Sequence, residues 1–202
     1  MTALSELLPA GGAGKVMDFV ASGTLPNGKA VVLKGDGQVE VISGTTFSES
    51  IPAGSEAIFN TGNTVLMSVS AISFDPNTAG KFVVAYRDSS NSRYGTACVG
   101  TISGTSISFG AEVVFNSGNT YYSAISFDPN AAGKFVVAYM DNGNSNYGTA
   151  IIGTMLGTSI SFGSEVVFNS GESTNFSISF DPNTANKFVV TYMDSSNSSY
   201  GT

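Results

Sequence analysis

Acidic side chains have the greatest capacity for chemistry in this sequence, and they recur at a fixed spacing. Asp75, Asp128 and Asp181 lie 53 residues apart, each within the motif ISFDPN, and Glu112 and Glu165 are separated by the same interval. Two carboxylates can hydrolyse a glycosidic bond when one acts as the acid and the other as nucleophile or base. A catalytic pair is expected once, whereas these acids return in successive copies. We therefore predict that the aspartates cap the turns that follow them and that the glutamates mark strand starts.

A second polar motif, Asp-x-x-Asn, occurs at 88–91, 141–144 and 194–197. Carboxylate and amide oxygens are the ligands that calcium prefers, but each turn carries a single carboxylate. Capping of the backbone by the aspartate is the favoured interpretation, and we predict no metal site. Asp141 and Asn144 of the middle turn remain candidates for contact with a ligand.

Signatures of catalysis are otherwise lacking. The chain has no histidine, which excludes histidine-dependent triads and most transition-metal sites. The motifs GxSxG and HExxH do not occur. Cys98 lies in a strand pattern, where a small buried hydrophobe is expected rather than a reactive thiol. We predict a protein that is not an enzyme and needs no cofactor.

Charge excludes two classes of partner. The chain has 8 basic and 15 acidic residues, a net charge of −7, and nucleic acid and anionic lipid both require a basic face. No segment approaches the roughly 18 apolar residues of a membrane helix, so membrane insertion is not expected. Only 11% of residues are charged and 24 are glycine, a composition typical of short strands joined by tight turns.

The chain is organised by an internal repeat. One phrase of 25 residues begins at Ile72, Ile125 and Ile178. A second phrase lies between the copies and reads GSEAIFN at 54–60, GAEVVFN at 110–116 and GSEVVFN at 163–169. A repeat protein is therefore predicted.

Each copy is expected to form four antiparallel strands. In the middle copy these are 124–127, 135–139, 147–155 and 159–168, with Gly163 as a bulge or break in the last. The continuous apolar run FVVAY indicates a strand covered on both faces. Four strands in about 50 residues, repeated in tandem, favour an all-β fold of β-propeller-like blades. An extended β-solenoid and a string of small sandwiches are the alternatives.

The blades of this interpretation are 54–109, 110–162 and 163–202, the last incomplete because it stops at the opening of its third strand. A propeller needs at least ~4 blades to close. We expect either that the polypeptide continues, which we favour, or that neighbouring chains complete the sheets in a homo-oligomer.

Residues 1–50 lack the repeat and are predicted to form a leader followed by a small β-meander, with strands at 16–25, 30–34 and 39–42. Turns at Pro26-Asn27-Gly28 and Gly35-Asp36-Gly37 separate these strands. We treat this part as an anchor or cap, separate from the repeats of 51–202.

The segments that precede each ISFDPN differ most between copies, at 63–71, 119–124 and 172–177. We predict that they are loops on the same face as the Asp-x-x-Asn turns. A shared framework with differing loops on one face is typical of a binding surface. Contact candidates are the aromatic residues Tyr121, Tyr122 and Phe176, although such rings also pack on sheet edges as part of the core.

Two sets of motifs resemble a known family. The leader LSELLPAGGAGKVMDFV resembles the N-terminus of structural proteins from marine tailed phages, including cyanophages. The phrases KFVVAYxDxxNSxYGTA and GTSISFGxEVVFNSG resemble the propeller-like arrays that follow it in those virion proteins. The resemblance covers essentially the whole chain and carries over no catalytic residue.

The resemblance implies a virion protein, assembled in the host cytoplasm, whose N-terminal part attaches to other virion proteins of the tail or capsid. The repeats would be displayed outward in a tail fibre, tail tip or capsid fibre. Leu4, Leu7 and Leu8 are candidates for docking on the particle. The alternative function is a carbohydrate-binding module that recognises a host surface glycan through the three aromatic residues.

Overall fold

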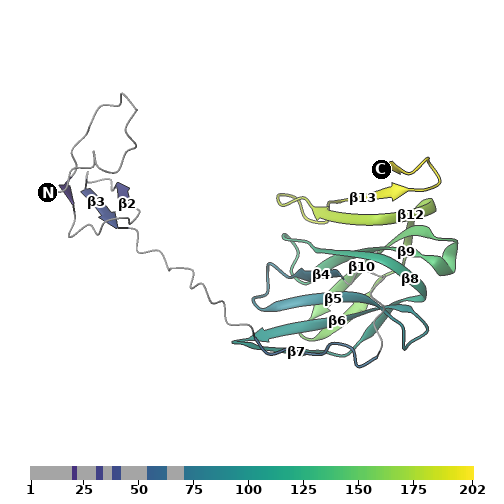
Figure 1. Ribbon diagram of the computed structural model, residues 1–202, viewed down its shortest axis with the longest axis horizontal. Helices are drawn as coiled ribbons and strands as arrows, with labels where there is room; N and C mark the ends of the chain where they lie inside the picture. Colours follow the sequence, from purple (N-terminus) through teal and green to yellow (C-terminus); the bar gives the residue numbers. More distant parts are fainter. Residues whose placement is uncertain (1–19, 22–30, 34–37, 42–53, 63–70) are drawn as a thin grey trace. The chain divides into compact units, whose positions relative to one another are not determined.

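The computed structural model describes residues 20–21, 31–33, 38–41, 54–62 and 71–202. The chain divides into two compact units, Met1–Ala53 and Gly54–Thr202, and each is described by itself. Almost all regular structure in the described residues is β-strand, and one short 3-10 helix, η2 (Asn142–Asn144), is the exception (Figure 1). In this part of the chain no helix is both long and apolar enough to cross a membrane.

The first unit contains β1 (Val20–Ala21), β2 (Val31–Leu33) and β3 (Gln38–Val41). β2 pairs with β3 in antiparallel fashion, but β1 pairs with β3 in parallel, which gives the order β1-β3-β2. The predicted meander order is therefore wrong. Alternation over a two-residue strand cannot specify which neighbour it joins. Leu4, Leu7 and Leu8 lie outside the described residues.

The second unit is an antiparallel sheet system. Its strands are β4 (Ala71–Phe74), β5 (Lys81–Asp88), β6 (Tyr94–Ser103), β7 (Ser106–Phe109), β8 (Val113–Phe127), β9 (Lys134–Asp141), β10 (Tyr147–Leu156), β11 (Ser159–Phe162), β12 (Val166–Phe180), β13 (Phe188–Asp194) and β14 (Tyr200–Gly201). The hydrogen-bonded path runs β14-β13-β12-β10-β9-β8-β6-β5-β4, with β7 on β6 and β11 on β10. The all-β prediction is confirmed, and so is the strand break at Gly163, which lies between β11 and β12.

Two long strands, β8 and β12, connect three segments of this sheet. The first segment contains β4 to β7 and residues 113–119 of β8. The second contains residues 120–127 of β8, β9 to β11 and residues 166–172 of β12, and the third contains residues 173–180 of β12, β13 and β14. Residues 113–119 of β8 pair with β6, whereas residues 120–127 pair with β9. β12 is divided in the same way between β10 and β13. β5 and β9 both begin at an Asp-Pro-Asn turn, and these turns contact one another, so the two strands run in the same direction. β8 must therefore fold back on itself between its two halves.

The fold-backs lie where free loops were predicted, and that prediction is wrong for 119–124 and 172–177. Both segments lie inside a long strand, β8 or β12, whose pairing changes there from the strand before it to the strand after it. Tyr122 and Asn175, 53 residues apart, take the left-handed φ values of 53° and 57° at the kinks, and the register shifts at each. Of the third predicted loop, Ala71 begins β4 and residues 63–70 lie outside the described part.

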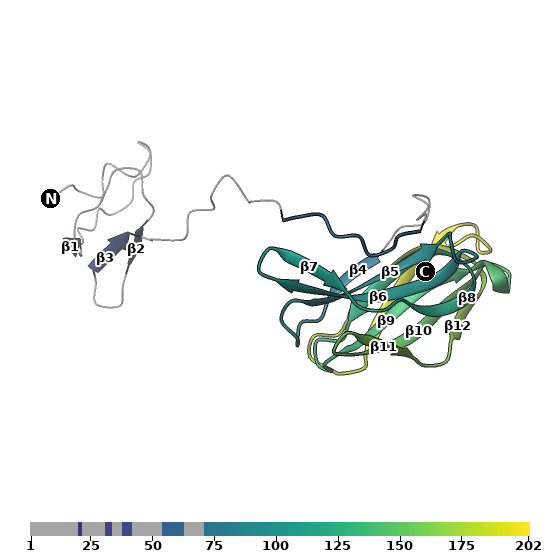
Figure 2. The ribbon, with the colours of Figure 1, turned by 90° about the horizontal axis from the view of Figure 1, so that it is seen from below.

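The three segments stack face to face. Val83 and Ala85 of β5 pack with Ala97 and Val99 against Phe135, Val137 and Tyr139 of β9. The alternate residues of β5 point the other way, and Phe82, Val84 and Tyr86 pack with Cys98, Phe59 and Phe109. Figure 1 shows the segments as layers, and in Figure 2 β6 overlies β9 and β10. The prediction that the FVVAY strand is covered on both faces is confirmed for β5 and β9.

The single cysteine behaves as a core side chain. Cys98 is fully buried, and burial, with a smaller effect of the Glu112 charge, raises the pKa of its thiol to about 12. A thiol that stays protonated is a poor nucleophile and a poor metal ligand. The expectation of a buried hydrophobe is confirmed.

The repeated acids have the structural roles predicted for them. Asp75, Asp128 and Asp181 each accept a hydrogen bond through Oδ1 from the backbone N–H two residues later, at N···O distances of 2.9, 2.8 and 2.8 Å. Glu112 and Glu165 directly precede β8 and β12. They also accept hydrogen bonds from buried tyrosines: Tyr86 Oη is 2.5 Å from Glu112 Oε1, and Tyr139 Oη is 2.8 Å from Glu165 Oε1.

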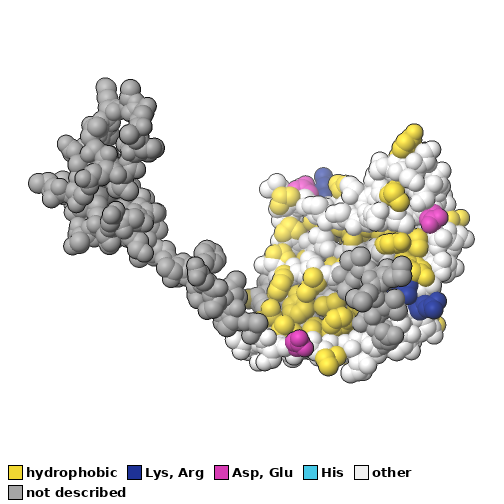
Figure 3. Space-filling view, in the orientation of Figure 1, with side chains coloured by type: hydrophobic (Ala, Val, Ile, Leu, Met, Phe, Trp, Pro, Cys, Tyr) yellow, Lys and Arg dark blue, Asp and Glu magenta, His cyan; other side chains and the backbone are white. Residues whose placement is uncertain are grey.

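Apolar side chains are also exposed at the first segment. Ile72 and Phe74 of β4 are 60% and 54% exposed. Figure 3 shows hydrophobic side chains gathered on the face where β4 and β5 lie in Figure 1. Scattered apolar residues are normal on a surface, but a group on one sheet face indicates a contact surface.

Candidate functional site

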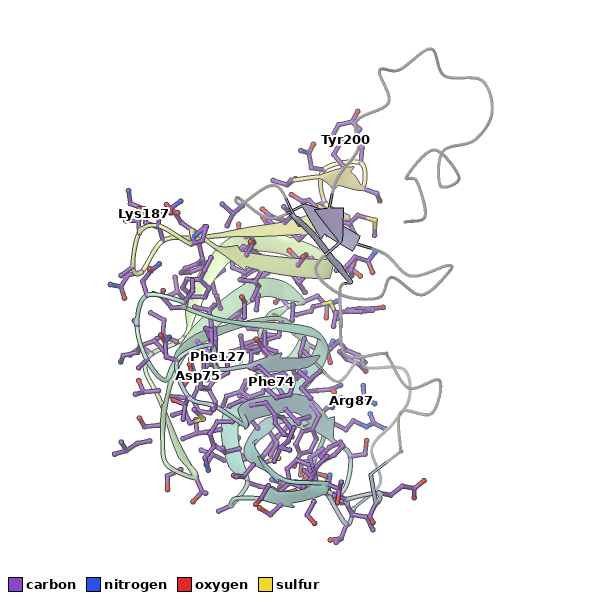
Figure 4. The ribbon with its side chains drawn as sticks, turned by 90° about the vertical axis from the view of Figure 1, so that its left-hand side faces the viewer. Phe74, Asp75, Arg87, Phe127, Lys187 and Tyr200 are labelled. Atoms are coloured by element: carbon purple, nitrogen blue, oxygen red, sulfur yellow. The ribbon has the colours of Figure 1, made fainter. Side chains whose placement is uncertain are left out.

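The candidate site lies at the edge where the fold-back of β8 meets the Asp-x-x-Asn turns. Asn119 Nδ2 donates to Asn142 Oδ1 at 3.1 Å, and Thr120 N donates to Arg93 O, also at 3.1 Å. The prediction that these two elements share a face is therefore confirmed. In Figure 4 Arg87 lies on one side of the stack, and Asp75 and Lys187 of the Asp-Pro-Asn turns lie toward the other.

Tyr121 is the centre of the site. The guanidinium carbon of Arg87 lies 4.5 Å from the centroid of its ring, a cation–π geometry. Asn119 Nδ2 donates to Tyr121 Oη at 3.2 Å. This hydrogen bond lowers the pKa of Tyr121; burial opposes the change, and the charge of Arg87 adds to it. A phenol surrounded by a cation and a donor is polarised for contact with polar groups.

Tyr122 stands beside it in an unusual backbone conformation. The two tyrosine rings lie 6.2 Å apart between centroids, and both side chains are half-buried. The left-handed φ of Tyr122 is uncommon for a bulky residue and costs about 1 kcal/mol or more. Such strain is often found at binding sites, where it aims a side chain. The fold-back therefore presents two aromatic rings at one edge.

Arg87, in β5, has no equivalent arginine in the other two copies of the repeat. Its side chain is only 6% exposed, and Nε and Nη1 have no hydrogen-bond partner among the described residues. The corresponding residues of the other copies are Met140 and Met193. Sequence reasoning missed Arg87, Asn119 and Asn142 as members of the site. A comparison of the copies position by position would have found Arg87, because it replaces methionine.

Asp141 and Asn144 have separate environments. The carboxylate of Asp141 is buried, and its Oδ1 accepts from Gly143 N at 3.0 Å and from Asn116 Nδ2 at 3.1 Å. The predicted capping role of Asp141 is thus confirmed. Asn144 is exposed in η2. In the described part of the chain no group of three or more His, Cys, Asp or Glu side chains could hold a metal ion.

Phe176 belongs to a different cluster. Its ring packs at 6.1 Å from Phe168 and 6.3 Å from Tyr192, and the position 53 residues earlier is the buried Ser123. The structure therefore brings together two of the three predicted aromatic contacts, Tyr121 and Tyr122. The third, Phe176, packs instead against Phe168 and Tyr192. The edge offers aromatic faces, a guanidinium and amides, groups that stack on sugar rings and bond to hydroxyls.

Comparison with known proteins does not place this chain in a family. No protein-family model matches this chain, and no curated protein matches it either. The residues, their contacts and the phage resemblance are therefore what support a function.

Proposed function

We propose that this chain is a non-enzymatic structural protein of a marine tailed-phage virion. Residues 1–50 attach to the particle, and 51–202 are displayed outward in a tail fibre, tail tip or capsid appendage. The main support is that neighbouring segments are joined by the same contacts twice along the chain. Asp75 Oδ2 accepts from Gly133 N at 3.2 Å, and Asp128 Oδ2 accepts from Asn186 N at 2.7 Å. Repeated contacts of this kind suit an array that extends away from a particle.

We further propose that the segments are blades of a β-propeller-like array. Each fold-back leads from the outer strand of one segment to the first strand of the next, and each segment packs its face on its neighbour. A single four-stranded sheet leaves both faces open, so stacking is required to bury them. The partners in this proposal are other virion proteins and further copies of the chain.

The proposal is tested on phage particles. An antibody raised against the chain should label purified virions, and removal of residues 2–14 should abolish incorporation. A finer variant replaces Leu4, Leu7 and Leu8 with serine, and Leu156→Ser, at a position 83% exposed on β10, serves as the matched control. Incorporation that is unchanged by both the deletion and the triple variant would exclude the anchor role.

A second candidate function is recognition of a host surface glycan. It is favoured by Arg87, Asn119 and the two tyrosines at the fold-back edge, which combine a stacking surface with hydrogen-bond donors. Tyr122→Ala should lower binding to host cells or a glycan array and leave the melting temperature unchanged. Phe176→Ala is the matched control, because loss of its packing should lower the melting temperature and leave binding unchanged. The reverse pattern would contradict glycan recognition at this edge.

A further inference from the structure

We infer that the junction of the first and second segments binds an anionic sugar, one that carries a carboxylate or a sulfate ester, and that Arg87 and Arg93 are the partners of its negative group. The inference rests on glycan recognition, the second candidate function above, and names the class of sugar that this edge selects. Two observations support it: both arginines of the chain lie at this junction, and one of them is buried with donors that have no partner.

The positive charge of the chain is unevenly placed. Arg87 and Arg93 are the two arginines of the sequence, they lie six residues apart, and both contact the fold-back of β8. The lysines of the repeats recur instead after the Asp-Pro-Asn turns of the opposite edge, as Lys81, Lys134 and Lys187. The net charge of the chain is −7. Two arginines at one place in an acidic chain concentrate positive charge there and favour a negatively charged ligand.

Arg87 is the buried member of the pair (Figure 4). As given above, its Nε and Nη1 have no hydrogen-bond partner among the described residues. The carboxylates near it in the sheet bond to their own turns. Oδ1 of Asp88 accepts from Ser90 N at 2.9 Å and Asn91 N at 3.3 Å, and Oδ1 of Asp141 caps η2. A buried cation without a partner is costly, and a bound anion would supply that partner.

Tyr121 connects the two arginines. The hydrogen bond from Asn119 has the largest effect on its phenol, burial opposes that effect, and the charges of Arg87 and Arg93 both act to lower the pKa. Both guanidinium groups are therefore close enough to act on one ring. The ring lies over Arg87, so it has to turn aside to admit an anion. A cation–π contact is then exchanged for charge-assisted hydrogen bonds, which are among the strong polar contacts of proteins.

The other groups at the junction suit a sugar. Tyr121 and Tyr122 offer rings for stacking, and the buried Oδ1 of Asn119 has no partner among the described residues and is left to accept from a hydroxyl. The planar donors of a guanidinium match the paired oxygens of a carboxylate or sulfate. An acidic sugar combines the three features that these groups recognise: a ring, hydroxyls and an oxyanion.

The junction of the second and third segments provides an internal comparison, because it is built in the same way with other residues. Met140 and Asn146 stand where the first junction has its arginines, and Thr174 stands where it has Tyr121. Glu172 replaces Asn119. Two positive charges and a stacking ring are absent there and a negative charge is added. Only the first of these two junctions is therefore expected to bind the anion.

The test measures binding to the full 202-residue chain by isothermal titration calorimetry. The probes are methyl glucuronide for a carboxylate, glucose 6-sulfate for a sulfate ester, methyl glucoside as the neutral sugar, and sodium acetate and sodium sulfate as free anions. At least one acidic sugar should bind about tenfold or more tightly than methyl glucoside and than the free anions. The tighter of the two acidic sugars identifies the anionic group.

Substitutions taken from the second copy locate the site. Arg87→Met and Arg93→Asn should each reduce the preference for the acidic over the neutral sugar about tenfold or more. Arg87→Lys keeps the charge without the planar donors and should lie between Arg87→Met and the wild type. Lys134→Met removes the same charge at the opposite edge and should keep the wild-type preference. Because methionine occupies this position in the other copies, Arg87→Met should fold with a melting temperature near or above the wild-type value.

The outcomes separate this inference from glycan recognition itself. A chain that binds methyl glucoside as tightly as the acidic sugars would overturn the inference and leave glycan recognition at this edge intact. Free anions that bind as tightly as the acidic sugars, or a preference that survives both arginine substitutions, would also overturn it. If none of the probes binds, the inference fails, and host-cell binding by the wild type and Tyr122→Ala still decides the proposed recognition.

Discussion

The two edges of the stacked segments carry similar polar residues and use them differently. At the Asp-Pro-Asn edge the motif is the same in each copy. Asp75 and Asp128 each accept a hydrogen bond through Oδ1 from a backbone amide of their own turn and through Oδ2 from a backbone amide of the next segment. At the fold-back edge the residues differ between copies, and Arg87 of β5 contacts Tyr121, which lies in the half of β8 that pairs with β9 in the next segment. The carboxylates of Asp75 and Asp128 are also buried and so are closed to a ligand, whereas the half-buried side chains at the varied edge retain donors and aromatic faces.

The largest expected effect concerns the Asp-Pro-Asn edge. Asp128→Ala removes the acceptor of two amides, Asn130 N and Asn186 N, at a position only 1% exposed. The free energy of unfolding should fall by about 3 kcal/mol, because buried donors without partners are costly. Urea unfolding measures the change, and Asp181→Ala is the matched control with a much smaller loss. Equal losses for both variants would show that the contact between segments adds no stability.

The interior between the edges predicts a pH dependence. Burial, followed by the hydrogen bond to Glu165, raises the pKa of Tyr139 in the folded state, and Tyr86 is raised by burial and Glu112 in the same way. An unfolded tyrosine ionises near pH ~10. The contribution that the protonated, buried tyrosines make to the free energy of unfolding is therefore fully present below about pH 10. Above that pH each tyrosine should lower the unfolding free energy by about 1.4 kcal/mol per pH unit.

Tyr139→Phe provides the check on this pH dependence. The variant should lose about 1 kcal/mol at neutral pH with the hydrogen bond, and it should show a shallower decline above pH ~10. Chemical unfolding at a series of pH values measures both. A decline as steep as in the wild type would mean that Tyr139 ionises in the folded state.

At the fold-back edge, two substitutions of Tyr122 separate its ring from its backbone. Tyr122→Ala and Tyr122→Gly both remove the ring, but only glycine takes a left-handed φ without strain. The glycine variant should therefore be the more stable by about 1 kcal/mol, the reverse of the usual order. Thermal unfolding measures the difference in stability. An alanine variant with a melting temperature equal to or above that of the glycine variant would contradict strain at the fold-back.

The smallest effect is on the titration of Tyr121. Asn119→Ala should raise the pKa of Tyr121 toward its ordinary value, because it removes the hydrogen bond that stabilises the phenolate. Arg87→Met, which introduces the residue of the other copies, should also raise it, because it removes the nearby positive charge. Phenolate absorbance measures the change, with Tyr121→Phe to identify the signal. If the pKa of Tyr121 were the same in both variants and in the wild type, Tyr121 would not be polarised by Asn119 and Arg87, and this argument for the candidate site would fail.

Features confined to a few consecutive residues were predictable. The apolar run in β5 and β9 indicated strands with two covered faces, and the Asp-Pro-Asn motif predicted a capping aspartate; both are confirmed. The fold-back at Tyr122 was not predictable, because no glycine or proline marks it. The order β1-β3-β2 was missed for a similar reason, since two residues of β1 carry too little pattern to select a partner.

The sequence by itself determined where strands and turns form, because backbone propensity, side-chain alternation and turn capping act over a few residues. The tertiary structure alone decided that Asp128 joins two segments and that Arg87 lies over Tyr121, 34 residues away. It also decided that Val83 is buried while Val189, in the same motif, is open. Identical side chains differ here because burial depends on which segment packs on them, and that contact is made between residues distant in the chain.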